Sequence, residues 1–537
     1  MWYPSSSTNC RRLSSFLLHD YQTNYLHGFL LHDYQTISGA IFISETSHTK
    51  GILHFVIASC CSSKQGKQMR TIEPRKHKCS SEYRDRLSEM PDDVIVHILS
   101  YLPTVDAVRT MLFRPFGNLW TLLPTLNFEV EEVLNKLIPD GIWTNNDVGR
   151  FYIFIRNVLT LHKGPFIDKF RLDLGWYYEG ERREAVDDIR MWWRFGLDKQ
   201  AKEIYFSDVT YEFFESFDFP NFTSQSLVTL ELCNCSIDPQ LQVNLGSLKK
   251  LILCEMNMCE EGFSQFICGC PSLQELRIVE PYYIKNLSFT APNIRKLSLV
   301  LVENEYDDDD NWLLDFPNLK TLDLALDRIP DVINVSSVRD VYLKELLFHM
   351  DDMNKPIMFR IFLEKFSCSE VFQLSPDASE PFLHSIYFSR LLRIRWTRVV
   401  LGLRVFCQSC LLGFYKLMRS SKHLEDLIIH TTTQLTHRSL CNTPNSQGFH
   451  ARTDLPPIEL PDPCVMPKLK TITLHGYAKP WKHQLQLIEF LLKSAPVLEK
   501  LVIVPNQCGL TAVEKLDFVT HVSSFQRSSP SARALCL

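Results

Sequence analysis

A six-residue pattern, L-x-x-L-x-L, recurs through the second half of the chain and constrains its fold more than any other feature. Clear copies are LVTLEL, LKKLIL, LQELRI, IRKLSL and LKTLDL, which begin at Leu227, Leu248, Leu273, Ile294 and Leu319, at spacings of 21, 25, 21 and 25 residues. This spacing is typical of leucine-rich repeats. The alternating L-x-L indicates a short strand with one buried side, and so small a unit buries that side only by stacking on its neighbours. The sequence therefore predicts an α/β fold whose main part is an irregular leucine-rich-repeat solenoid.

The pattern also predicts which side chains form the core. We expect inward-pointing side chains at Leu230, Leu232, Leu251, Leu253, Leu276, Leu297, Leu299, Leu322 and Leu324. Looser copies begin at Leu343, Leu363, Leu383, Leu424, Leu469 and Leu498. Proline stands two residues before the first apolar position in five copies, where it ends the preceding segment and favours extended geometry. The Asn or Cys that usually closes a repeat is present only as Cys235 and Asn506, so we expect no asparagine ladder.

Several segments do not follow the repeat. Residues 1–84 hold the octapeptide FLLHDYQT twice and end in a polar, basic stretch, so we expect a disordered or spurious extension, with Met69 as an alternative start. The solenoid is expected over 131–430, with an acidic insert at 303–312. A flexible loop is expected over 431–464, terminal repeats over 465–505 and a tail over 506–537.

Length and composition limit the function classes. At 537 residues the chain is too long for one ordinary core. A net charge of −5 gives no indication of nucleic-acid or membrane binding. The N-terminal residues lack the basic and apolar regions of a secretory signal, so the 17 cysteines are expected to be thiols in a reducing compartment, the nucleus, the cytoplasm or both. Their spacings, such as C-N-C at Cys233, are too tight for a zinc site without other ligands, so we expect no metal and no cofactor.

The segment DRLSEMPDDVIVHILSYLPTVDAVRTMLF, residues 85–113, is predicted to form two short helices. Pro91 suits a first helical turn, and the acids after it suit the positive end of a helix. An apolar stripe follows at Val94, Ile95, Ile98, Leu99 and Leu102, and Pro103 ends the helix. Thr104 is expected to cap a second helix on which Val108, Met111 and Leu112 align. Two helices this short cannot bury all of this apolar surface between themselves, so part of it is expected to bind a partner. Composition alone leaves a small helical core as an equal alternative.

This segment resembles the F-box of plant F-box proteins, in the run RLSEMPDDVIVHILSYLPTVDAVRT followed by NLWTLLPTLNF, and an F-box is expected over 85–130. The run MPKLKTITLHGYAKPWKHQLQLIEFLLKSAPVLEKLVIV resembles the FBD region that closes F-box/FBD/LRR proteins. The resemblance implies a substrate-recognition adaptor of an SCF-type ubiquitin ligase. In such proteins the F-box binds a Skp-type linker, and through it a cullin-based ligase, while the repeats hold a target protein.

The resemblance places linker-binding residues at Leu87, Pro91, Val94, Ile95, Ile98, Leu99, Leu102, Pro103, Val108, Leu119 and Trp120. The family usually has a Ser-basic-basic-Trp or Phe segment after the second helix, and here MLFRPFGNLW is about one residue shorter and contains Pro115. The alternative function is therefore a leucine-rich-repeat scaffold whose degenerate F-box does not recruit the ligase. The catalytic motifs G-x-S-x-G, H-E-x-x-H, G-x-G-x-x-G and the P-loop are not found, so we expect no catalytic residues and no enzyme activity.

Overall fold

The computed structural model describes residues 89–112, 116–137, 145–177, 179–210, 219–281, 288–290, 292–301, 313–326, 331–333, 335, 337–346, 361–376, 378–379, 382–383, 394–403, 408–431, 465–477, 482–505 and 512–536. The chain divides into two compact units, Met1–Cys79 and Ser80–Leu537, and every described residue belongs to the second. The predicted extension at 1–84, the insert at 303–312, nearly all of the loop at 431–464, and Leu87 lie outside the described residues.

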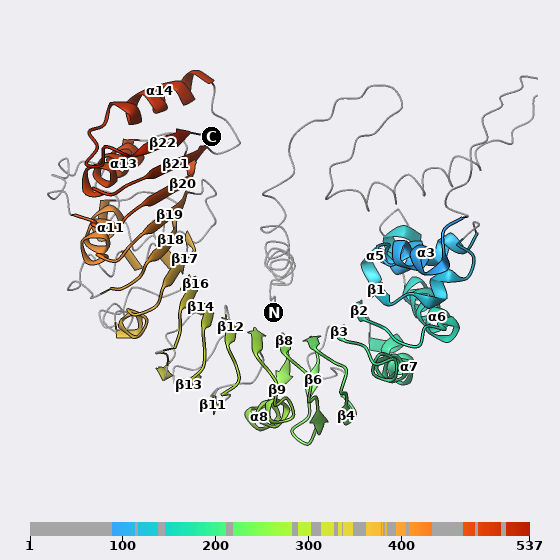
Figure 1. Cartoon of the computed structure of the whole chain (residues 1–537). Coiled ribbons are helices and arrows are strands. Elements are labelled where there is room, and N and C mark those ends of the chain that lie inside the picture. The colour runs from blue at the N-terminus through green and yellow to red at the C-terminus, as the bar shows by residue number, and fades with distance from the viewer. Residues whose placement is uncertain are drawn as a thin grey trace, which may run out of the picture. The chain divides into compact units, whose positions relative to one another are not determined.

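One parallel sheet of 15 strands runs through the described part of the chain, in sequence order from β1 to β22 (Figure 1). Its strands are β1 (Thr125–Glu129), β2 (Lys169–Tyr177), β3 (Glu203–Thr210), β5 (Thr229–Cys233), β8 (Lys250–Cys254), β10 (Glu275–Val279), β12 (Lys296–Leu301), β14 (Thr321–Leu326), β16 (Asp340–Leu346), β17 (Val371–Leu374), β18 (Arg398–Leu403), β19 (Asp426–Thr431), β20 (Thr471–Tyr477), β21 (Lys500–Pro505) and β22 (Arg533–Cys536). Consecutive strands that are all parallel neighbours are the arrangement of a solenoid, which confirms the predicted fold class.

Short strands pair beside the main sheet. They are β4 (Phe222–Thr223) with β7 (Val243–Asn244), β6 (Ser236–Ile237) with β9 (Asn257–Met258), and β11 (Ser288–Thr290) with β13 (Leu313–Asp315) and β15 (Asp331–Ile333). The helices are α3 (Asp92–Leu99), α4 (Thr104–Arg109), α5 (Val130–Leu137), α6 (Asn145–Leu161), α7 (Glu179–Asp198), α8 (Glu260–Cys268), α11 (Gln408–Ser420), α13 (Lys482–Ser494) and α14 (Ala512–Ser524), with 3₁₀ turns η1 (Thr110–Leu112) and η2 (Leu119–Leu122).

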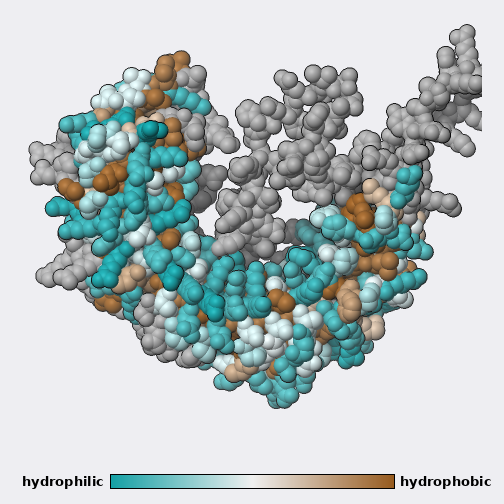
Figure 2. All heavy atoms as spheres, in the orientation of Figure 1, coloured by the Kyte–Doolittle hydropathy of each residue, from teal (hydrophilic) through white to brown (hydrophobic). Residues whose placement is uncertain are grey.

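The helices α7, α8, α11 and α13 lie on one side of the sheet in Figure 1. Alternate strand residues point toward that side and are buried, and all nine predicted inward leucines are among them. The residues between them form the other side, which we call the open face; it includes Arg171, Tyr205, Glu231, Ile252 and Ile428. Figure 2 shows this part of the surface as mostly hydrophilic, with hydrophobic atoms gathered over the N-terminal helices and α14.

Successive repeats are joined by a short polar ladder that was not expected. Asn293 donates from Nδ2 to the Pro271 carbonyl, and Asn318 donates in the same way to the Pro292 carbonyl, both at 2.8 Å. The Ser337 hydroxyl continues the series to the Pro317 carbonyl at 2.8 Å. These asparagines lie in the proline turn before the strand, and the absence that the sequence predicted concerns an asparagine after the strand.

The register of three looser repeats differs from the prediction. Leu343 is the second inward residue of β16, after Val341, and does not begin a repeat. Leu363 and Leu383 lie in helical turns, and the strands of this region are β17 and β18 instead. The inward positions there are Phe372 with Leu374 and Val399 with Leu401. Valine and phenylalanine fill these positions as well as leucine does, so a search for leucine misplaced the strands.

Two predicted boundaries also change. Strand β1 pairs with β2, so the sheet begins inside the segment assigned to the N-terminal helical module. The predicted tail at 506–537 contains α14 and β22, and β22 pairs with β21. The end strands of the sheet are therefore β1 and β22. Among the described helices, none is long and apolar enough to span a membrane.

Replacing Leu251 with alanine is expected to lower the free energy of unfolding by about 2–5 kcal/mol, as for other fully buried leucines. Leu251 is fully buried and lies in register between Leu230 and Leu276 of the neighbouring strands. Urea denaturation of the full chain measures the change. The matched control is Ile252→Ala, since Ile252 is next to Leu251 in β8 but lies half-buried on the open face. Equal losses from the two variants would contradict the assignment of faces.

Candidate functional site

The two helices of the N-terminal module each begin directly after a proline. Pro91 precedes α3, and its carbonyl accepts the Ile95 amide at 3.1 Å. Pro103 precedes α4, and its carbonyl accepts the Ala107 amide at 3.0 Å. The fixed φ of proline favours the start of a helix, and the acids in the first turn of α3 lie at its positive end. The predicted start of the first helix is confirmed.

Thr104 has a different role from the one expected. It is the first residue of α4 rather than its cap, and no side-chain cap is formed there. Its hydroxyl instead accepts the backbone N–H of Asn127 in β1 at 2.7 Å. Thr104 is buried, so this hydrogen bond attaches the helical module to the first strand of the sheet.

Helix α3 has an inner and an outer apolar side. Ile95 and Leu99 are each 1% exposed and lie on the side that contacts η2, where Trp120 is also buried. Val94 is 40% exposed and Tyr101, just after the helix, is 53% exposed. The predicted apolar stripe is thus divided between a buried and an exposed side. The inner residues form the core of the module, and a partner can reach them only if the module rearranges.

The outer residues form a surface that we call the α3 face, made of Val94, Ile98 and Tyr101. Val94 and Ile98 lie at positions i and i+4 on one side of α3, and Tyr101 follows in the turn after the helix. Ile98 is half-buried, and the Tyr101 ring lies edge-on to the His97 ring with centroids 5.1 Å apart. The spacing from Val94 to Tyr101 was visible in the sequence, but Tyr101 was not among the predicted binding residues.

The remaining predicted residues are dispersed. Pro91 is exposed, and Leu102, Pro103, Val108 and Leu119 are half-buried. Exposed apolar residues that were not among the predicted binding residues are Met90, Met111 and Leu122. In place of a third α-helix, the described residues after α4 form the 3₁₀ turns η1 and η2, and Pro115 lies outside the described residues.

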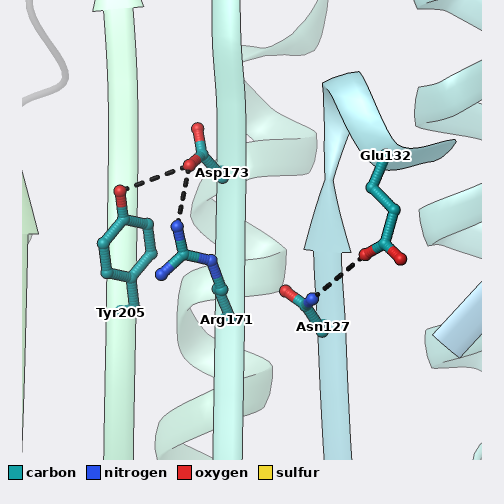
Figure 3. Close-up of polar contacts among 5 residues, drawn as sticks. All are labelled: Asn127, Glu132, Arg171, Asp173 and Tyr205. Carbon is teal, nitrogen blue, oxygen red and sulfur yellow. Dashed lines mark hydrogen bonds and ion pairs between the residues drawn. The ribbon is translucent and has the colours of Figure 1, made fainter. Parts of the chain in front are cut away.

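A polar cluster lies on the open face at the N-terminal end of the sheet (Figure 3). The Arg171 guanidinium donates to Asp173 at 3.1 Å, and the Tyr205 hydroxyl donates to the same carboxylate oxygen at 3.2 Å. The guanidinium also lies over the Tyr205 ring, 3.4 Å from its centroid, in a cation–π contact. Asn127 donates to Glu132 at 3.3 Å beside them. These contacts join β2 to β3, and β1 to α5.

The carboxyls of this region are partly removed from water. Burial raises the pKa of Asp173, although Arg171 and Tyr205 oppose the shift. Burial likewise raises the pKa of Glu129 and of Glu231, and Arg171 is the first group to oppose it in both cases. The Arg171 guanidinium therefore lowers the pKa of all three carboxyls, but in none of them does it cancel the increase caused by burial.

Two histidines stack on the open face at the other end of the sheet. His430 in β19 and His475 in β20 are register partners, and their rings are nearly parallel with centroids 4.6 Å apart. Burial lowers the pKa of His430 to about 4 and also lowers the pKa of His475. Both imidazoles are therefore neutral at neutral pH, so they add ring surface rather than charge to the open face.

Comparison with known proteins places two family models on this chain. A family model described as "At1g61320/AtMIF1, LRR domain" matches residues 158–507, and a model of the F-box domain matches residues 87–113. The F-box/FBD/LRR-repeat protein At5g56420 of Arabidopsis thaliana is 26% identical over 471 residues, which are 84% of this chain and 99% of that protein. The F-box/FBD/LRR-repeat protein At4g26340 of the same plant is 25% identical over 461 residues, with the same two shares. The FBD-associated F-box protein At5g38590 is 29% identical over 283 residues, 49% of this chain and 62% of that protein.

Replacing Glu129 with glutamine is expected to raise the free energy of unfolding at neutral pH. Burial places the pKa of Glu129 above its ordinary value in the folded chain. The stability that this carboxyl contributes is therefore fully present below its ordinary pKa and is lost as the pH rises through the raised pKa. Since glutamine does not ionise, the advantage of Glu129→Gln should exist at neutral pH and vanish below about pH 4. Urea denaturation across this pH range measures it.

The control for this prediction is Glu425→Gln. Glu425 accepts a hydrogen bond from Lys470 at 2.8 Å, and this contact lowers the pKa of Glu425. Glutamine at position 425 removes a favourable charge, so it should not raise the free energy of unfolding at neutral pH. A gain of equal size in both variants would show that general charge reduction, and not burial of Glu129, is responsible.

Proposed function

Because the chain belongs to the leucine-rich-repeat family described as At1g61320/AtMIF1, LRR domain, and has an F-box ahead of that domain, we propose that it is a substrate receptor of an SCF-type ubiquitin ligase. In this proposal the F-box binds a Skp-type linker protein, which connects it to a cullin-based ligase. The leucine-rich repeats and the FBD-like region bind a target protein, which other subunits then ubiquitinate. The chain is a non-enzymatic adaptor in this scheme.

The observation that supports linker binding most directly is the α3 face. Val94 and Tyr101 expose apolar surface although Ile95 and Leu99 on the same helix are fully buried. Exposed apolar residues grouped on a rigid base are typical of protein-binding surfaces. The helix that carries them packs on η2 through its buried side, and Thr104 attaches the module to β1. The F-box match at 87–113 covers this face.

The open face supports target binding. Its side chains lie outside the inward core, although Val300 and Ala325 on it form a small buried apolar cluster of their own. Charged, aromatic and apolar residues occur along it, as Arg171, Tyr205, Ile252 and Ile428 show. Extended solenoid surfaces of this kind bind other proteins. The chemical step needs no group on this face, because the ligase subunits supply it. We also propose that the protein acts in the reducing environment of the nucleus, the cytoplasm or both.

The alternative proposal is a leucine-rich-repeat scaffold that binds a partner but recruits no ligase. One observation favours it. The described residues after α4, which leave out 113–115, include the 3₁₀ turns η1 and η2 and no α-helix up to β1, where the F-box family has a third helix. A 3₁₀ turn presents its side chains differently from an α-helix, so the linker would lose part of its contact surface.

Replacing Val94 with aspartate is expected to weaken binding of a purified Skp-type linker at least tenfold, measured by isothermal titration calorimetry. Burying one aliphatic side chain contributes about 1.5–3 kcal/mol, and about 1.4 kcal/mol corresponds to a tenfold change in affinity. Tyr101→Asp should act in the same direction. The matched control is Val513→Asp on α14, where the valine is 77% exposed and far along the chain from the F-box.

Ile95→Asp is expected to differ from Val94→Asp in its effect on the stability of the module. Ile95 is buried inside the module, so an aspartate there must be desolvated without a partner and should destabilise the module itself. Thermal unfolding should therefore change for Ile95→Asp and stay unchanged for Val94→Asp. Linker binding by Val94→Asp that equals the wild type would refute the α3 face. A wild-type chain that binds no linker at all would favour the scaffold.

Target binding is tested by affinity purification with mass spectrometry, with and without proteasome inhibition. Proteins that accumulate with the wild type under inhibition should be lost with the double variant Ile252→Glu and Ile428→Glu, since both isoleucines lie on the open face. The control variant is Ile153→Glu, because Ile153 is an exposed apolar residue on α6. If Ile153→Glu loses the same proteins and the double variant retains them, the open face is not the target-binding surface.

A further inference from the structure

Three metal-ligating side chains meet on the open face between β5 and β8. Glu231 and Cys233 are two residues apart in β5, so both point to the same face. Cys254 is the register partner of Cys233 in β8, which places the two thiols side by side. One carboxylate oxygen and the two Sγ atoms all lie within 4.8 Å of one another. Among the described residues, this is the one group of three or more His, Cys, Asp or Glu side chains whose ligand atoms lie this close together.

The neighbouring cysteine does not take part. Cys235 is fully buried, and its thiol donates to the Cys233 carbonyl at 3.0 Å. The C-N-C pair therefore does not share a site, and the second thiol comes from the next repeat. Cys233 and Cys254 are both free thiols. Cys233 is 7% exposed, while Cys254 and Glu231 are half-buried, so an ion can reach the group from the open face.

We propose that Glu231, Cys233 and Cys254 form a zinc site with three protein ligands on the open face of the solenoid. Zinc takes Cys sulfur at about 2.3 Å and carboxylate oxygen at about 2.0–2.2 Å in a tetrahedral arrangement. Those bond lengths place two sulfurs and one oxygen about 3.5–3.8 Å apart, so donors that already lie within 4.8 Å need only small side-chain movements. The rigid register of β5 and β8 supplies this arrangement without any loop having to fold around the ion.

The donor set selects zinc among the common ions. Calcium and magnesium prefer oxygen ligands and would leave the two sulfurs unused. Copper(I) prefers sulfur ligands and would gain little from the carboxylate. Zinc accepts both kinds of donor. Each coordinating thiol transfers its proton to solvent and no electrons are exchanged, so zinc uptake releases protons.

Three protein ligands leave the fourth position of the tetrahedron open toward solvent. Water fills that position in the isolated chain, as in other zinc sites with three protein ligands. The open position points to the face that we propose for target binding, so a donor side chain of a bound protein could replace the water. The metal site itself does not depend on that function, because it rests only on the geometry of β5 and β8.

Cobalt titration of the reduced, chelator-treated full chain tests the proposal. Cobalt(II) replaces zinc in such sites and shows thiolate-to-cobalt charge-transfer absorption in the near ultraviolet. We expect a single strong Co²⁺ site with this absorption, which Zn²⁺ displaces. The double variant Cys233→Ser and Cys254→Ser should lose the absorption and bind Zn²⁺ at least about tenfold more weakly, since even partners of the metal ligands contribute that much to affinity.

Further variants make the test specific. Glu231→Gln should keep the charge-transfer absorption but weaken Zn²⁺ binding, because it removes the oxygen ligand alone. Cys254→Ser replaces a half-buried residue and provides a single variant if the double one fails to fold. The matched control is Cys268→Ser with Cys368→Ser, two exposed free cysteines, which should bind cobalt as the wild type does.

Two results would overturn the site. One is a cobalt spectrum that survives in the Cys233 and Cys254 variants and disappears in the control, which would place the metal at other cysteines. The other is a folded, reduced wild type that shows no thiolate-to-cobalt absorption. Neither result bears on linker binding, which the Val94→Asp measurement tests separately.

Discussion

The structure depends on the burial of paired inward side chains that a single repeat cannot enclose. Leu251 and Leu253 of β8 are covered only because Leu230 and Leu232 lie on one side of them and Leu276 and Ile278 on the other. Each strand is thus stabilised by its neighbours, and a sheet of this kind needs a cover at each end. The helical module attached through Thr104 lies at the β1 end, and α14 with β22 lies at the other.

The open face differs from the inward face in the kinds of residue that it can hold. Because the core uses alternate residues, the intervening positions can hold groups that would be costly in a core. Asp173, Glu129 and Glu231 are examples, since burial raises the pKa of each and Arg171 compensates only in part. The ladder register then brings side chains of successive repeats together. The Arg171–Tyr205 contact, the stacked histidines and the Cys233–Cys254 pair all arise in this way.

The same reasoning explains the two sides of α3. A helix of eight residues with apolar groups all along it cannot bury them all against a module of this size. Ile95 and Leu99 fill the inner side and fix the helix on η2, which leaves Val94 and Tyr101 outside. The buried and the exposed apolar residues are therefore separated on one short segment. That separation makes the α3 face a surface of defined shape rather than a loose apolar segment.

The sequence by itself determined the solenoid, the inward leucines of β5 to β14 and the start of α3, because periodicity and proline act locally along the chain. It misplaced β16 to β18, where valine and phenylalanine replace leucine, and it could not divide the apolar stripe of α3, because a helical period does not say which half packs on the chain itself. Only the tertiary structure paired Cys233 with Cys254, or Arg171 with Tyr205. Such pairs depend on strand register, which is set by the packing of whole repeats and not by the spacing of the residues that meet.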